Sequence, residues 1–415
     1  MDTTIYTQIQ KELSEGILPF WEKYARNPET EGFYGEIDNA GNPDKEKSRT
    51  SVMVARYLWS YSAAARYFGK VSYLDFADAA YQDLAHHFFD TLNGGFYWSV
   101  TASGDVEKDD KVLIAQAYVL YAVCEYAAAL REVRKLDYPA TVVMDKALAL
   151  YSLAERYARS SSGGYIEACT AAWKPYKTYK ISEWDTECAL SLNTNMHMML
   201  AFTNLHKTLP AVYEDQKDLR ELVGKTLKNL AELVSEKILM NNGHVGMCFD
   251  ADWNRIGGEI SYGHDIEMSW LLWDAANEIE NDDLLAKIRP QCVTLAHTVF
   301  EQAFDKNLGS LKGSPEKSKW GDFRSWWCQA ESLVGFYNAW EISGVEDYKL
   351  VFQKQWEWIM KYQRDSVNGD WFASVYADGK PVEEASKGNI WKCSFHNVRC
   401  CLEILKRAGI KSEKN

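Results

Sequence analysis

Two histidines lie in segments whose residue types suit acid–base chemistry. His264 belongs to SYGHDIEMSWL and precedes Glu267 by three residues, so on a helix the two side chains share one face. An imidazole ordinarily has a pKa near ~6.5, and a neighbouring carboxylate can orient it or change its proton affinity. His396 lies in WKCSFHNVRCC, after an aromatic-rich segment. Two such histidines, each expected near the start of a helix, indicate one shared acid–base site.

Other polar side chains fall in equally apolar segments. Asn193 and His197 are four residues apart and would share a helix face. Further polar and aromatic residues in such segments are Arg56, Trp326, Trp327, Gln329, Glu331, Trp391 and Arg399. Because buried charges need partners, these residues predict a polar network inside the fold. Two structural alternatives stay open, namely a helix-joining pair of Arg56 with Glu331 and a core histidine at His197.

Two metal sites are conceivable from the spacing. His264 and Glu267 have the i, i+3 arrangement of helical-bundle metal sites, and Cys393, His396 and Cys400 resemble part of a zinc site. Neither set is complete, because the chain has no second His/Glu pair of this type and no clean CxxC. We therefore expect no metal ligands here.

The aromatic content of the chain also suits a protein that binds sugars. Aromatic residues make up 13% of the chain, with 16 Trp and 24 Tyr, and flat amphipathic rings of this kind line sugar-binding sites, although most would serve helix packing. A glycoside hydrolase would need two carboxylates across a cleft, for which Glu267 and Glu331 are candidates. The number of histidines fits that chemistry poorly. A non-catalytic sugar-binding protein is a further alternative.

Six turns that combine glycine with apolar residues divide the chain. They contain Gly32, Gly95, Gly164, Gly243, Gly309 and Gly369, at intervals of 60 to 79 residues. Glycine permits the positive φ of a tight turn, and the residues that follow suit a short strand or hairpin. Each interval has room for two helices, so the spacing indicates six repeats.

Between the turns the apolar periodicity is helical. The predicted helices are residues 4–24, 50–68, 73–89, 111–131, 139–157, 186–209, 214–240, 264–280, 282–304, 324–343, 345–362 and 389–407. Helices that follow a turn are apolar nearly all round, whereas those that precede one are amphipathic. This alternation predicts an all-α fold, an (α/α)6 barrel of six inner and six outer helices with short β-hairpins in the loops.

The remaining totals restrict the class of protein. A net charge of −13 argues against nucleic acid and anionic membranes as partners. We expect no apolar run of the roughly 18 to 20 residues that a membrane helix needs, and the N-terminus lacks a signal-peptide pattern. Nine scattered cysteines suit a reducing compartment. We expect one catalytic domain over residues 1–415, cytoplasmic, monomeric or homodimeric, with a disordered tail at 409–415.

One long irregular segment, residues 169–185, has two interpretations. Loops of this length in a compact domain are often functional, so it is a candidate lid over a substrate. A plain surface connection is the alternative.

The chain resembles the N-acylglucosamine 2-epimerase family, and within it the cellobiose 2-epimerases. The matching segments are ARYLW, NTNMHMM, SYGHDIEMSWLL, WWCQAE and WKCSFHNVR, together with ILPFWEKYA and EGFYG near the start. The resemblance implies an (α/α)6 barrel and inversion at C2 of the reducing-end aldose of a small sugar, with no redox cofactor or metal. It makes His264 and His396 the acid–base pair and Glu267 the residue that orients or polarises His264. The implied substrate-binding residues are Arg56, Asn193, His197, Trp326, Trp327 and Trp391.

Two positions depart from the family pattern. Ile114 stands where many relatives carry a tyrosine, and Val54 stands where cellobiose 2-epimerases commonly carry an asparagine. Both changes make the expected pocket less polar, and both bear on the substrate more than on the reaction. Cellobiose or a related β-1,4-disaccharide is the first expectation. Mannose 2-epimerisation, aldose–ketose isomerisation and N-acylglucosamine 2-epimerisation are the alternatives.

Overall fold

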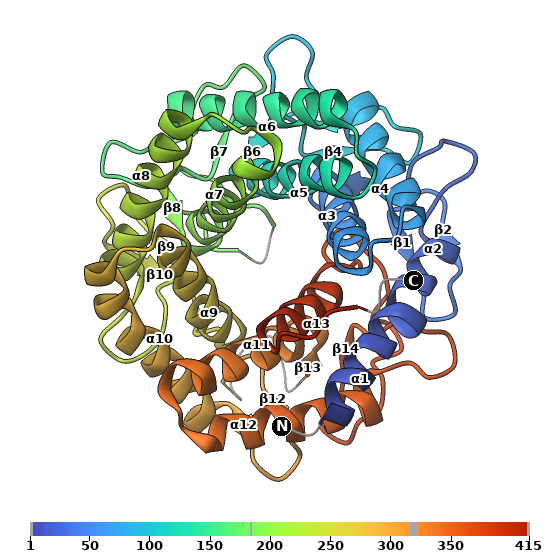
Figure 1. Cartoon of the computed structure of the whole chain (residues 1–415), viewed down its shortest axis with the longest axis vertical. Helices are drawn as coiled ribbons and strands as arrows, with labels where there is room; N and C mark the ends of the chain where they lie inside the picture. The colour runs from blue at the N-terminus through green and yellow to red at the C-terminus, as the bar shows by residue number, and fades with distance from the viewer. Residues whose placement is uncertain (1–2, 183–184, 316–322, 413–415) are drawn as a thin grey trace.

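Two concentric rings of helices make up the computed structural model, which describes residues 3–182, 185–315 and 323–412 (Figure 1). The inner ring consists of α3 (Ser51–Phe68), α5 (Leu113–Glu132), α7 (Leu192–Val212), α9 (Tyr262–Ile279), α11 (Trp326–Ser343) and α13 (Phe395–Arg407). Each inner helix contacts the next, and α13 contacts α3, so the ring closes. The predicted all-α (α/α)6 barrel is confirmed.

The outer ring covers the inner one. Its members are α1 (Thr3–Lys11) continued by η1 (Glu12–Ile17) and α2 (Leu18–Tyr24), α4 (Ser72–Asp83) with η2 (Leu84–Phe88), α6 (Asp137–Tyr157), α8 (Lys217–Leu233) with η3 (Val234–Ile238), α10 (Asp282–Gln302), and α12 (Glu346–Trp358) with η4 (Ile359–Gln363). The η segments are π-helical turns that run on directly from α-helices. The amphipathic pattern explains this ring, because α8 buries one apolar stripe and leaves its charged face exposed.

Helix α5 shows why the inner helices are apolar all round. It is long and apolar enough to cross a membrane by length and composition, so the expectation that no such run exists is wrong. All of the residues in its most apolar stretch are buried. Its neighbours α3, α6 and α7 pack around it and remove that apolar surface from water.

Short antiparallel strands join consecutive repeats at the end of the barrel where the inner helices begin. The strands are β1 (Glu36–Ile37), β2 (Pro43–Asp44), β3 (Arg49–Thr50), β4 (Ser99–Val100), β5 (Val106–Lys108), β6 (Lys111–Val112), β7 (Ala168–Cys169), β8 (Leu190–Ser191), β9 (Cys248–Phe249), β10 (Arg255–Gly257), β11 (Phe304–Asp305), β12 (Ser310–Leu311), β13 (Arg324–Ser325) and β14 (Ser374–Val375). In the pairs β3–β4, β6–β7, β8–β9 and β13–β14, the strand before an inner helix pairs with the strand after the next outer helix. These pairs fix the starts of neighbouring inner helices relative to one another.

Several predicted details are wrong. The sixth and twelfth predicted helices begin at Leu192 and Phe395, six residues later than expected in each case. In the first glycine turn the positive φ belongs to Glu31, at +58°, instead of Gly32, whereas the glycines of the other five turns have the expected positive φ.

The C-terminal segment was expected to be disordered from residue 409. Its described part is instead anchored, because Ile410 N donates to Leu405 O and Ser412 Oγ donates to Tyr67 O. Residues 413–415 lie outside the described part of the chain.

The described part of the 169–185 segment is also anchored. The hydroxyls of Tyr176 and Tyr179 both donate to the Asp110 carboxylate, at 2.7 and 3.0 Å, and Trp173 Nε1 donates to Asn93 O. Residues 183–184 lie outside the described residues. These bonds favour the surface-connection interpretation for residues 169–182.

A buried ion pair links Arg49, in the β3–β4 strand pair, to Asp83 of α4. It gives a prediction about stability. Arg49 donates to both carboxylate oxygens of Asp83, at 2.8 and 3.0 Å, and its Nη1 donates to Thr101 O. Arg49→Met would leave Asp83 buried and unpaired, so we expect the free energy of unfolding to fall by about 3–5 kcal/mol in urea denaturation. The double variant Arg49→Met/Asp83→Leu should recover most of the loss. Equal stability of Arg49→Met and wild type would contradict this role.

Candidate active site

The histidines predicted to act together lie near the first turns of two inner helices. His264 is the third residue of α9, and His396 is the second residue of α13. Gly263 precedes His264 for a steric reason, since a Cβ there would lie 2.4 Å from Trp327 and 2.6 Å from Cys328. The start of α9 is therefore packed closely against α11.

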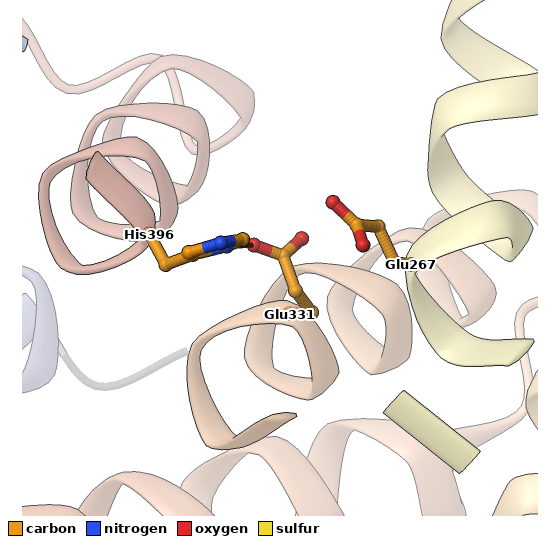
Figure 2. A group of neighbouring side chains, drawn as sticks. All are labelled: Glu267, Glu331 and His396. Atoms are coloured by element: carbon orange, nitrogen blue, oxygen red, sulfur yellow. Dashed lines mark hydrogen bonds and ion pairs between the residues drawn. The ribbon is translucent and has the colours of Figure 1, made fainter. Parts of the chain in front are cut away.

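A chain of buried hydrogen bonds holds His396. Its Nδ1 lies 2.6 Å from Glu331 Oε1, and the other Glu331 oxygen accepts from Trp270 Nε1 at 3.1 Å. Figure 2 shows the His396 ring pointing at the Glu331 carboxylate, with Glu267 on the far side of it. Because a carboxylate only accepts, Nδ1 of His396 carries the proton and Nε2 is left as the free position.

Arg399 pairs with two carboxylates at once. Its Nη2 donates to Glu331 Oε1 at 2.7 Å and also to Glu267 Oε1. Among the described residues, ligand atoms of Glu267, Glu331 and His396 come within 4.8 Å of one another, which is close enough to share a metal ion. The guanidinium of Arg399 already places a positive charge beside both carboxylates, where such an ion would bind.

His264 has different partners. Its Nδ1 lies 2.7 Å from Ser261 Oγ, and its Nε2 lies 3.0 Å from Asn193 Oδ1. Glu267 was expected to orient or polarise His264; its described hydrogen bond is to Arg399 instead of His264. Glu267 still acts on His264 through its charge, which raises the pKa of that imidazole against the larger lowering effect of burial.

One indole links the two histidines. The Trp327 ring centroid is 4.9 Å from that of His264 and 6.0 Å from that of His396, and Trp326 contacts His396 at 6.2 Å. Trp326, Trp327 and His264 are partly exposed. The two imidazoles therefore contact the same indole ring.

Arg56 is close enough to His396 for its charge to lower the pKa of that imidazole. Its Nη2 donates to Tyr118 Oη at 2.7 Å, and its Nη1 donates to Trp391 O. The alternative of a structural Arg56–Glu331 pair is wrong, since Glu331 pairs with Arg399. The Nε of Arg56 is buried without a hydrogen-bond partner, so this group is not fully satisfied by the protein.

His197 is fixed by its own helix. Its Nδ1 lies 2.6 Å from Asn193 O, so Nδ1 donates there and Nε2 remains an acceptor. Its ring contacts the Tyr118 ring at 4.7 Å, which places it beside Arg56. Burial lowers the pKa of His197 to about 3, with Glu267 opposing the shift.

Burial also lowers the pKa of the other two histidines. For His396 the pKa falls well below its usual range, and the guanidinium groups of Arg56 and Arg399 lower it further. All three imidazoles are thus favoured in their neutral form, in which each can accept a proton.

The structure brings all nine predicted site residues into one connected region. Asn193 is connected to the region through its hydrogen bond with His264, and Trp391 is connected through its carbonyl oxygen, which accepts from Arg56. The Trp391 ring lies 5.8 Å from the Trp98 ring. Residues that sequence reasoning did not assign to the site are Ser261, Tyr118, Trp270, Glu331 and Arg399. The last two were noted as unusual charges in an apolar helix, which was the available signal.

The fold and the site define a class: a helical barrel with two histidines facing a shared indole where its inner helices begin. The chain belongs to the N-acylglucosamine 2-epimerase family, whose model matches residues 32–400. It is 33% identical to a cellobiose 2-epimerase of Bacteroides fragilis over 98% of this chain and all of that one, and 32% identical to one of Dictyoglomus turgidum over 97% and 98%. The solved cellobiose 2-epimerase of Bacillus thermoamylovorans superposes with a TM-score of 0.87, at 33% identity, over 98% of this chain and all of that one.

The pKa of His197 predicts how acid affects stability. Since the folded pKa is about 3 and the unfolded value is near ~6.5, the stabilisation is complete above the unfolded pKa and is lost as the pH falls below it. His197→Gln should reduce the pH slope of the unfolding free energy by up to about 1.4 kcal/mol per pH unit between roughly pH 6 and 4. Urea denaturation at several pH values measures it. His86→Gln, at an exposed position, is the control, and an unchanged slope in His197→Gln would contradict the prediction.

Proposed function

We propose that this protein is a sugar 2-epimerase that inverts C2 of a reducing-end aldose by removing and returning a proton. The observation that carries the proposal is the contact of both His264 and His396 with the Trp327 ring. Nε2 of His396 is free, and Nε2 of His264 is bonded to the Asn193 amide, which a sugar hydroxyl can replace. The family membership and the full-length similarity to cellobiose 2-epimerases support the same reaction.

The chemistry follows from the ring-opened sugar. Its C2 proton is acidified by the neighbouring carbonyl, and removal of that proton gives a cis-enediolate. His396 acts as the base through Nε2, because Glu331 holds Nδ1 protonated. His264 returns a proton from the opposite face. His264 must therefore begin the turnover protonated at Nε2. The two residues exchange these roles in the reverse reaction, so the pair carries one transferable proton with either epimer bound and two at the enediolate.

Arg56 and His197 bind the oxygen atoms of the reacting carbon chain. The Nε of Arg56 lacks a protein partner, and its guanidinium is fixed by Tyr118 and Trp391. Such preorganised donors stabilise the negative charge that develops on O1 without reorganisation. His197 is neutral, so its free Nε2 accepts from a sugar hydroxyl.

The remaining site residues position the sugar rings. Trp326, Trp327 and Trp391 are partly exposed and offer apolar faces on which pyranose rings stack. Asn193 binds sugar hydroxyls through its side-chain amide, whose oxygen is hydrogen-bonded to His264 in the free protein.

The proposed substrate is cellobiose or a related β-1,4-disaccharide, because the full-length relatives are named for cellobiose. Ile114 and Val54 are buried apolar side chains, which leaves mannose a second candidate. A glycoside hydrolase is disfavoured by the ion pairs, because Glu267 and Glu331 both bind Arg399 and neither is held as a free proton donor.

The setting of the reaction is part of the proposal. We propose that residues 1–415 act as one catalytic domain in the cytoplasm, as a monomer or homodimer. All nine cysteines are free and buried, which suits a reducing compartment.

Proton exchange with solvent tests the reaction directly. Incubation of cellobiose, mannose, glucose, mannosyl-glucose and N-acetylglucosamine in heavy water should give deuterium at C2 of both epimers of the true substrate, as measured by NMR and chromatography. Epimerisation without exchange would refute the deprotonation scheme. Release of monosaccharides from a disaccharide would favour the hydrolase instead.

Single substitutions test the residue roles. His264→Ala and His396→Ala should each lower kcat at least about 10²-fold while the fold is retained, since general acid–base groups contribute about 10²- to 10⁴-fold. Glu331→Gln should also lower kcat, because an amide no longer fixes the His396 tautomer. His86→Gln is the control, as His86 is exposed in the η2 segment of the outer ring. Substantial turnover in either alanine variant would remove that histidine from the pair.

A further inference from the structure

Ser261 makes two contacts with the same residue at the start of α9. It is the residue before the first helical position, with extended backbone angles of −123° and 101°, and its Oγ accepts from the backbone N–H of His264 at 3.4 Å. The same Oγ lies 2.7 Å from Nδ1 of the His264 ring. One hydroxyl therefore caps the helix and contacts the imidazole.

The partner of this imidazole differs in kind from that of His396. Glu331 is an acceptor only, so Nδ1 of His396 is a donor throughout. A serine hydroxyl rotates and can donate to an unprotonated nitrogen or accept from a protonated one. The other nitrogen of His264 faces Asn193 Oδ1, an acceptor. In the free protein Nε2–H therefore donates to Asn193, and Ser261 O–H donates to Nδ1.

We propose that Ser261 is a positioning residue that holds His264 in both of its neutral tautomers, that of the free protein and that with a sugar bound, by reversing the direction of one hydrogen bond. When a sugar replaces Asn193 at Nε2, the proton moves to Nδ1, which donates to Ser261 Oγ. Nε2 then either offers its lone pair or carries the proton to be transferred. The ring keeps its place when the sugar binds because the bond is reversed rather than broken, and Nδ1 then donates to Ser261 in both protonation states of the cycle.

Charged groups around His264 explain why a neutral partner is needed. Glu267 faces it from its own helix, Asp185 from the segment before α7, and Glu331 from α11, and all three favour the imidazolium. His396 on α13 disfavours a second positive charge nearby. A fourth carboxylate at position 261 would hold the proton too tightly for release. The Ser261 hydroxyl fixes the orientation and position of the His264 ring without adding charge.

The inference rests on the proposed function, and four substitutions at position 261 test it. Ser261→Ala should lower kcat about tenfold or more with little change in KM, and should move the alkaline limb of the kcat/KM profile down by about one pH unit, because protonated Nδ1 loses its acceptor. Ser261→Asp keeps the cap but only accepts, so the alkaline limb should move up by about one pH unit or more. Ser261→Thr keeps the hydroxyl and should restore kcat to within about threefold.

Helix capping is separated from the imidazole contact by two controls. Ser261→Gly loses the hydroxyl but costs a cap only slightly, so it should behave like Ser261→Ala in kcat and pH profile. Asn281 caps the outer helix α10 by accepting from Leu284 N at 2.9 Å. Asn281→Ala should lower Tm and leave kcat and both pH limbs unchanged. A wild-type pH profile in Ser261→Ala, or a shifted one in Asn281→Ala, would overturn the proposal.

A measurement without substrate separates this inference from the proposed reaction. In histidine labelled with ¹⁵N, the free protein near pH 8 should show unprotonated Nδ1 and protonated Nε2 for His264, and titration should show the imidazolium at a lower pH in Ser261→Ala than in wild type. Protonated Nδ1 at high pH would overturn the reversal. If no aldose exchanges its C2 proton in the wild type, the proposed function fails, while these spectra still decide the role of Ser261.

Discussion

The arrangement of the site depends on one guanidinium group between two carboxylates. Nη2 of Arg399 donates to Glu267 of α9 and Glu331 of α11, while Arg399 itself belongs to α13. All three side chains are almost wholly buried, so their charges have lost hydration and must compensate one another. A buried ion pair of this kind adds little net stability compared with apolar packing. Its contribution is positional, because Glu331 can bind Nδ1 of His396 in only one arrangement while Arg399 holds it.

The barrel explains why these side chains meet. His264, Glu267, Trp327, Glu331 and His396 all lie in the first two turns of inner helices. The short strand pairs hold those starts side by side, and the closed ring prevents any one helix from moving away. Helix N-termini also carry partial positive charge within the first turn. Several such ends directed at one site favour an anion, which is the charge that an enediolate would bring.

Sequence periodicity predicted the twelve helices because each repeat must bury its own apolar faces, and that requirement is local. It also predicted which polar residues belong together, since charges in apolar helices need partners. It could not predict the individual partners. Arg56 meets Tyr118 across 62 positions and Arg399 meets Glu267 across 132, so both pairs exist only once the ring has closed. The contact of Ser261 with His264 is local, but serine before a helix is explained by capping alone, and nothing in its spacing indicated a second partner.

Helix α5 departs from the family pattern at Ile114 but keeps a tyrosine hydroxyl that binds Arg56. The tyrosine expected from the family resemblance is replaced by Ile114, yet Tyr118 lies four residues later on the same face and bonds to Arg56. Four residues correspond to a rise of about 6 Å along a helix, so the hydroxyl lies farther from the start of α5. The face is thus apolar at Ile114 and polar beside Arg56. Under the proposed function, recognition through oxygen atoms would be concentrated near the reacting end of the sugar, while the next ring would meet an apolar surface that binds by stacking and exclusion of water. A site of that kind would tolerate variation in the second sugar and discriminate at the first.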